Sequence, residues 1–403
     1  MKKDKPKKRK RDDIEEEENE EKESSLLKLN VQKKIPIKKN ENIFLINNDI
    51  LIVFKKEGKN KEELNELYEI YDGESYQKIS NFTNPYKSSQ VSNIINLFSK
   101  APNIFSLATI VEKEKNKKNI LIFSFEIKDK KYEFKENQLI EIDFIPQLIE
   151  LNDTSFLVLN KDKKEIYIYQ KKNSKYEKRK EIIEIPKDLE TEGLQTYFIN
   201  KNNFILTDLK PDQESEDDAS LFPLYIYNIN DFKFIRKEEI NFSDENCTFI
   251  EKVAICNYND TNLFLAYNNN IALYNYKDKE VKQIVEEDEN YQIAFGLQFQ
   301  NNILRVYGGN LMENKICLFD FKVNKDSAEL YSQSENIFDD LQLDEIDGQE
   351  LGNIACDYFN KDLFSKNILV YDKDNLYVLS EKEIEKVKKS GSKKKTKSKS
   401  KNK

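Results

Sequence analysis

Histidine and tryptophan are both absent from this chain of 403 residues. Without histidine the protein cannot form a Ser-His-Asp or Cys-His nucleophile system, an imidazole general base or a histidine-ligated zinc site. Many enzyme classes are therefore excluded together. Carboxylate and lysine chemistry remain open, but 74 acidic residues make chance carboxylate pairs inevitable, so such a pair alone identifies no catalytic site.

Cysteine is scarce, and no two cysteines stand in a Cys-x-x-Cys pair, the spacing that zinc ribbons and thioredoxin motifs need. Each cysteine lies in or beside an apolar run, where a free thiol packs as a small hydrophobic group. We therefore expect buried, reduced thiols and a reducing compartment for the four positions Cys247, Cys256, Cys317 and Cys356.

Glycine is also scarce, with nine residues and a single pair, Gly308-Gly309, outside any phosphate-binding pattern. We expect a turn at this pair. The acidic runs at 286–289 and 339–347 lack the spacing and central glycine of a calcium-binding EF-hand loop. The sequence thus predicts solvated loops there, with no metal site and no cofactor.

Long apolar runs are missing as well. No stretch approaches the roughly 18 to 20 residues that cross a bilayer, and the N-terminus is charged. We expect a soluble intracellular protein without a membrane partner.

Charge is concentrated in blocks at the two ends of the chain. Residues 12–23 carry nine acids and one lysine, and residues 386–403 carry ten lysines and no acid. Blocks of like charge repel themselves and stay solvated, so both ends are expected to be disordered tails. A basic block precedes the acidic residues 12–23 and resembles a nuclear import signal; a nonspecific polycationic tail is the alternative. Its basic residues are Lys2, Lys3, Lys5, Lys7, Lys8, Arg9, Lys10 and Arg11.

The part of the chain between the charged ends is strongly acidic. The formal charge of the whole chain is −8, and the three end blocks contribute +7, −8 and +10, which leaves about −17 for residues 24–385. Such a surface repels phosphate at long range. RNA or DNA contact would then come from the lysine tails, from a local patch or through a basic partner.

Short runs of β-branched and aromatic residues, separated by polar turns, dominate the central region, which is typical of strands. One aromatic strand recurs seven times, and its starts are separated by 70, 46, 58, 47, 45 and 60 residues, near the period of a propeller blade. Radial stacking of four-stranded blades would bury both faces of each sheet. The seven strands begin at Ile50, Ile120, Ile166, Leu224, Ile271, Ile316 and Leu376.

These repeats predict an all-β fold, a seven-bladed β-propeller with disordered charged tails at both ends. The expected division is a basic and acidic tail at 1–40, the propeller at 41–380 and a lysine-rich tail at 381–403. A β-sandwich pair or mixed all-β assembly is the alternative. Insertions are expected near 55–103 and 210–220, and helices only at 60–70 and 380–389.

The repeat resembles the WD-repeat β-propellers in architecture. Phe319-Asp320, followed by Phe321, and Asn275 after Tyr274 stand where that family has Trp-Asp. The absence of tryptophan and histidine removes the family's Trp-Asp and Gly-His signatures themselves.

Within that superfamily the chain resembles the non-catalytic subunits of eukaryotic tRNA (guanine-N7)-methyltransferase in size, basic tails and blade order. The segment from Phe204 to Lys210, followed by Leu224-Tyr-Ile-Tyr, resembles their strand, charged turn and strand, although Asp208-Leu-Lys210 replaces an Asp-Arg-Asp-Glu turn. In those subunits this region faces the catalytic subunit. The resemblance therefore implies that the partner-binding residues are Thr207, Asp208 and Lys210.

The function expected from the sequence is a non-catalytic scaffold in a nuclear RNA-modifying complex, specifically the accessory subunit for tRNA guanine-N7 methylation. Its partner would be a basic methyltransferase subunit, and it would contact tRNA indirectly or through its lysine tails. A general nuclear adaptor in ribosome biogenesis, RNA processing or chromatin is one alternative. A propeller enzyme that uses carboxylates is another.

Overall fold

The structure is a computed structural model that describes residues 25–27, 29–37, 42–46, 49–57, 64–88, 94–97, 103–114, 117–128, 131–187, 189, 191, 194–208, 221–241, 253–267, 270–285, 293–310, 315–325, 327–334, 337, 364, 366–371 and 375–381. The regular elements within these ranges are strands, numbered β1 to β28. Among the described residues no helix is long and apolar enough to cross a membrane.

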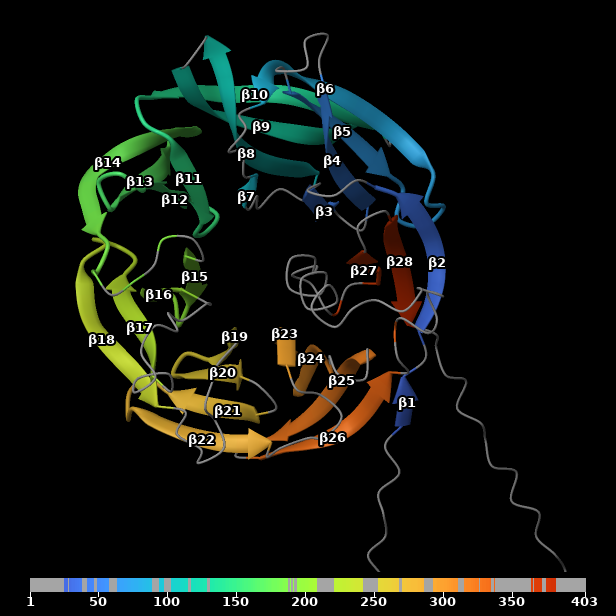
Figure 1. Cartoon of the computed structure of the whole chain (residues 1–403), viewed down its shortest axis with the longest axis vertical. Helices are drawn as coiled ribbons and strands as arrows, with labels where there is room; N and C mark the ends of the chain where they lie inside the picture. Colours follow the sequence, from blue (N-terminus) through green and yellow to red (C-terminus); the bar gives the residue numbers. More distant parts are fainter. Residues whose placement is uncertain are drawn as a thin grey trace, which may run out of the picture.

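The strands follow the chain around a ring, and within each group they run in sequence from the centre outward (Figure 1). Group 1 is β3 (Asn42–Ile46), β4 (Asp49–Glu57), β5 (Leu64–Tyr71) and β6 (Lys78–Ser88). Group 2 is β7 (Ile95–Leu97), β8 (Ile104–Glu114), β9 (Lys117–Lys128) and β10 (Lys131–Ile142). Group 3 is β11 (Pro146–Glu150), β12 (Ser155–Asn160), β13 (Glu165–Lys172) and β14 (Lys175–Glu184).

The second half of the ring continues this order. Group 4 is β15 (Leu194–Phe198), β16 (Asn203–Asp208), β17 (Leu221–Asn228) and β18 (Phe234–Asn241). Group 5 is β19 (Val253–Asn259), β20 (Asn262–Tyr267), β21 (Asn270–Asn275) and β22 (Glu280–Val285). Group 6 is β23 (Ile293–Gln300), β24 (Ile303–Asn310), β25 (Lys315–Asn324) and β26 (Ser327–Ser334). Group 7 contains β27 (Ile368–Tyr371) and β28 (Asn375–Glu381).

The ring of antiparallel sheets is a β-propeller, as the sequence predicts. Every predicted aromatic strand is a strand of the structure, in β4, β9, β13, β17, β21, β25 and β28. Groups 1 and 2 form one eight-stranded sheet because β6 pairs with β8 at Lys87↔Glu112 and Ser88↔Val111. The division into seven separate blades therefore stays a prediction.

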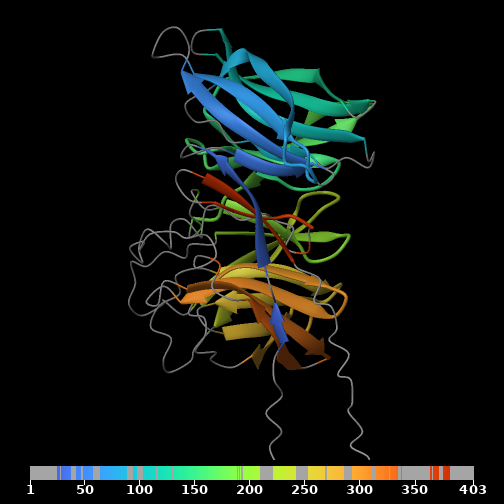
Figure 2. The ribbon, with the colours of Figure 1, turned by 90° about the vertical axis from the view of Figure 1, so that its right-hand side faces the viewer.

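The N-terminal segment supplies two further strands along the outside of the ring (Figures 1 and 2). β2 (Leu29–Pro36) pairs antiparallel with β28, and β1 (Ser25–Leu27) pairs parallel with β26. The expected boundary at residue 40 was therefore wrong for residues 25–36. These residues belong to sheets because Leu29, Ile35 and Ile37 are buried apolar side chains.

The sequence prediction was also wrong for part of residues 55–103. The segment expected to be helical, 60–70, contains most of β5, and the expected insertion contains β5, β6 and β7. The pair Gly308-Gly309 lies within β24, opposite Ile316 and Cys317, and does not form a turn. Two-residue hairpin turns with positive φ occur at Asn173-Ser174 and Asn301-Asn302.

The cores lie between neighbouring sheets. Leu157 and Ile168 of group 3 pack in one cluster with Phe204 and Tyr225 of group 4. Cys317 is buried in a similar cluster between groups 5 and 6, whereas Cys256 is partly exposed at its edge. Cys247 and Cys356 lie outside the described residues. Each sheet therefore buries one face against each neighbour, which explains the short, two-sided apolar strands.

Polar contacts join the rims of neighbouring groups. Gln138 of β10 exchanges two hydrogen bonds with the backbone of Tyr176 in β14, at 2.7 and 2.8 Å. Arg179 of β14 donates to the Asn230 carbonyl of group 4 at 3.2 Å. Tyr76 donates to Asn367 at 3.1 Å, which joins group 1 to group 7. These bonds link group 2 to group 3, group 3 to group 4 and group 1 to group 7.

Buried tyrosines in these cores predict a loss of stability in alkali. Burial raises the pKa of Tyr227 to about 12, and burial together with Asp153 raises that of Tyr176 to about 12. An unfolded tyrosine ionises near pH ~10, so this stability is fully present below pH ~10 and is lost as pH rises toward ~12. We expect the midpoint temperature of thermal unfolding to decrease as the pH is raised from 10 to 11, and to decrease less steeply in the variant Tyr227→Phe. Tyr331→Phe, at an exposed position, is the control. The prediction would be contradicted if the phenolate absorbance of all tyrosines reached its full value near pH 10 while the protein was still folded.

Candidate functional site

The predicted partner element lies at the end of β16. Thr207 is fully buried, and its hydroxyl donates to the carbonyl of Pro223 in β17 at 2.7 Å. That bond holds the two strands together, so the Thr207 side chain is not a surface contact. Asp208 is the last residue of β16, and Lys210 lies outside the described residues, as do Lys2 to Arg11.

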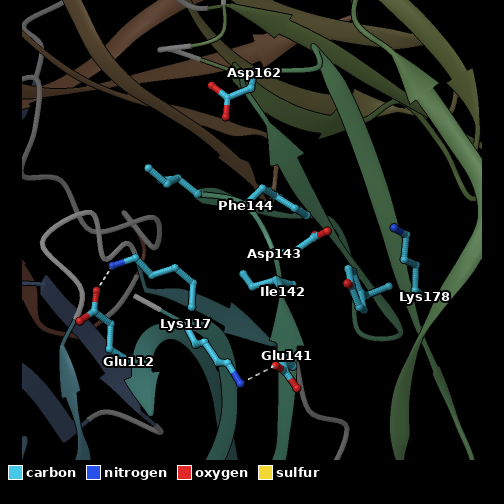
Figure 3. A pocket seen from close by; sticks show the side chains of 11 residues that line it. Glu112, Lys117, Glu141, Ile142, Asp143, Phe144, Asp162 and Lys178 are labelled. Atoms are coloured by element: carbon cyan, nitrogen blue, oxygen red, sulfur yellow. Dashed lines mark hydrogen bonds and ion pairs between the residues drawn. The ribbon is translucent and has the colours of Figure 1, made fainter. Parts of the chain in front are cut away.

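The structure instead points to a groove between groups 2 and 3, which sequence analysis missed. Its volume is about 860 Å³, and it is lined from the facing ends of β8 and β9, from the connection of β10 to β11 and from the connection of β12 to β13. Figure 3 shows Asp162 and Phe144 in its upper part, with Glu141 and Lys117 below. The lining side chains are Glu112, Lys117, Lys118, Glu141, Ile142, Asp143, Phe144, Ile145, Asp162, Tyr169 and Lys178.

The charges of the groove are only partly paired. Lys118 forms a short ion pair with Glu112, and Lys117 lies 3.8 Å from Glu141. Within the described ranges neither Asp143 nor Asp162 forms an ion pair. The groove therefore presents two carboxylates to whatever enters it.

Phe144 and Tyr169 form the aromatic wall beside these carboxylates, and Phe144 packs on the buried Tyr167. The rings of Phe144 and Tyr167 are 5.3 Å apart, and the Lys178 ammonium lies 3.5 Å from the centre of the Tyr167 ring. Burial raises the pKa of Tyr169, and the neighbouring Tyr167 and Asp143 raise it further. The Tyr169 phenol is thus neutral at physiological pH, and the wall already holds one cation on an aromatic face.

The connection from β10 to β11 forms the apolar edge of the groove. Residues 143–145 turn the chain between the two sheets, and Pro146 begins the inner strand β11. Phe144 packs inward on Tyr167, whereas Ile145 is 56% exposed. The signal in the sequence was the apolar pair Phe144-Ile145 inside a turn, but nothing in the sequence placed Asp162 opposite it.

Two other polar clusters in these described ranges, around Arg305 and Glu66, lie inside the sheets. No group of three or more cysteine, aspartate or glutamate side chains there is arranged to hold a metal ion. The Arg305–Asp320 ion pair and the Glu66 hydrogen bonds are buried within the sheets. The groove, unlike these buried groups, opens to solvent.

Comparisons with known proteins give a likeness of fold only. No protein family matches the sequence, and no curated protein matches it. A protein from Lactobacillus plantarum has a TM-score of 0.47 and 10% identity, over 73% of this chain and 84% of that chain. The RRP9 WD40 repeats have a TM-score of 0.47 and 8% identity, over 88% of this chain and 100% of that chain. A candidate 6-phosphogluconolactonase from Bacteroides uniformis has a TM-score of 0.42 and 9% identity, over 70% and 80%. The assignment to β-propellers depends on the strand order of this chain itself.

Proposed function

We propose that this chain is a non-catalytic scaffold that binds a basic protein partner in a nuclear RNA-modifying complex. The observation that carries the proposal is the groove between groups 2 and 3, in which Asp143 and Asp162 form no ion pair to a described cation. The surrounding body has a net charge of about −17, which attracts a basic surface and speeds its encounter. The chain's role in this proposal is to bind and orient, and it needs no cofactor.

The more specific proposal is an accessory subunit that supports tRNA guanine-N7 methylation. It depends on the resemblance described above, whose strand element corresponds to β16 and β17. The partner would be a basic methyltransferase subunit, contacted at Asp208 and Lys210. Contact with tRNA would belong to that subunit and to the lysine tails, because the acidic body repels phosphate.

Purification of the tagged full-length chain from the nuclear fraction of its native cell, at moderate salt, tests this function. We expect a stoichiometric basic methyltransferase and a tRNA N7-methylguanosine activity that disappears when this chain is depleted. Deleting Lys2 to Arg11 should move the protein out of the nuclear fraction. Asp208→Lys with Lys210→Glu should weaken partner recovery.

Two other outcomes would change the assignment. Ribosome-assembly or chromatin factors in place of a methyltransferase would indicate the general adaptor and remove the tRNA role. A chain that elutes alone at every salt concentration would contradict a scaffold function altogether.

A further inference from the structure

We infer that the groove between groups 2 and 3 binds an arginine-containing segment of the protein partner, with an aliphatic residue beside the arginine. This inference rests on the proposed scaffold function and gives the chemistry of the partner. It assigns the recognition to Asp143, Asp162 and the aromatic wall.

Charge is the first reason for a cationic occupant. Glu112 and Glu141 have lysines opposite them, whereas Asp143 and Asp162 have no cationic partner in the described part of the chain. The lining as a whole contains four acids and three lysines. A cation that binds Asp143 and Asp162 breaks no internal ion pair, so its binding does not reduce the stability of the folded protein.

The aromatic wall favours arginine over lysine. A guanidinium group is planar, stacks on aromatic rings and bonds carboxylates in a bidentate way, whereas an ammonium is a compact, strongly hydrated charge. Phe144 lines the groove next to Asp143 in the chain, so one guanidinium can stack on the Phe144 ring and bond Asp143 at the same place. Lys178, which lines the groove, lies on the ring of Tyr167, so the aromatic cluster behind Phe144 already holds one cation.

The exposed side chain of Ile145 is the reason to expect an aliphatic residue beside the arginine of the bound segment. It borders the same space and is more than half exposed, so an incoming leucine or isoleucine would cover it. Covering Ile145 in this way removes apolar surface of both side chains from water, which stabilises the bound segment. A segment with both features is held by charge and by apolar contact, which a purely basic tail cannot match.

Fluorescence anisotropy with the full-length protein and a labelled peptide, Gly-Ala-Leu-Arg-Arg-Leu-Ala, tests this inference. We expect saturable binding that weakens about tenfold or more in the double variant Asp143→Asn with Asp162→Asn, which keeps side-chain size and removes charge. Lys178→Gln should strengthen binding a few-fold because a competing cation leaves the ring. The control Asp260→Asn, an acid in the turn between β19 and β20, should stay within about twofold.

Peptide controls separate this site from general attraction to an acidic body. The peptide with both arginines replaced by glutamine should not bind, and the one with lysines should bind several-fold more weakly. Equal binding by the wild type and the double variant, or no binding at all, would overturn the inference. So would saturable binding of a labelled uridine oligonucleotide, without the peptide, that the double variant strengthens, since the groove would then bind phosphate.

The chain's own lysine tail is the remaining occupant to test. If a chain without residues 382–403 binds the peptide more than about tenfold better, that tail fills the groove and the partner inference falls. Recovery of a native complex with no peptide binding would leave the scaffold function standing. Peptide binding to a chain that purifies alone would support the groove as a peptide site and contradict the scaffold function.

Discussion

A chain without residues 1–36 is expected to lose cooperative folding or to melt at least 10 °C lower than the full chain. This deletion removes β2, the outer strand beside β28, and with it Leu29 and Ile35 from the core. Ile35 packs with Leu369, Leu376 and other buried residues between groups 7 and 1. Two such side chains contribute about 3 to 6 kcal/mol, a large share of the roughly 5 to 15 kcal/mol that stabilises a domain.

A deletion of residues 1–24 is the matched control, because it ends just before β1. We expect its far-ultraviolet circular dichroism and thermal midpoint to equal those of the full chain. A synthetic peptide of residues 25–40 should restore the midpoint of the larger deletion, since β2 is held by main-chain hydrogen bonds and apolar contact. Equal melting of the two deletions would contradict the role of β2.

Asp320→Leu is expected to lower the free energy of unfolding by about 3 to 5 kcal/mol. Arg305 and Asp320 face each other across β24 and β25 and are 4% and 5% exposed. Two bonds join them, at 2.7 and 2.8 Å, and Arg305 also bonds Glu381 of β28. Burial alone would lower the pKa of Arg305, but Asp320 and Glu381 raise it, so the guanidinium stays charged and must be paired.

A double-mutant cycle distinguishes a buried ion pair from simple packing. The combined variant Arg305→Met with Asp320→Leu should be less destabilised than the sum of the single changes, because no buried charge is left unpaired. Lys128→Met removes an exposed ion pair with Glu133 at 2.7 Å and should cost at most about 1 kcal/mol in urea unfolding. Additive losses in the buried pair would contradict this account.

The β-propeller could be predicted because its strands alternate β-branched and aromatic residues with unusual regularity. The repeat strands at Ile166, Leu224, Ile271 and Ile316 are all third strands of their groups. Ile50 is in the second strand of group 1, which explains why the first spacing, 70 residues, is the longest. The third strand of that group, β5, was mistaken for a helix.

The mistake at β5 has a physical cause. Glu66 is fully buried in this strand and accepts hydrogen bonds from Asn84 at 2.9 Å and Thr109 at 3.2 Å, as well as from Tyr68. A carboxylate on the buried face breaks the alternation on which strand prediction depends. Two of its three partners, Asn84 and Thr109, come from β6 and β8, so the sequence around Glu66 does not reveal them.

The groove could not be predicted for a similar reason. Asp143 and Asp162 are two acids among 74, and only the pairing of β11 with β12, and of β12 with β13, brings their connections together. The predicted partner element differs from the prediction at Thr207. Its residues form the expected strand, but the hydroxyl of Thr207 is used inside the sheet.

The pairing of β2 with β28 also determines when the protein can be completed during its synthesis. Ile35 of β2 pairs with Leu376 of β28, so β2 leaves the ribosome roughly 340 residues before the strand with which it pairs. At about 5 to 20 residues per second, β2 has to wait between roughly 17 and 70 seconds with its apolar residues unpaired. Translation speed and chaperone binding to the nascent N-terminus should therefore decide how much of this protein reaches a closed ring.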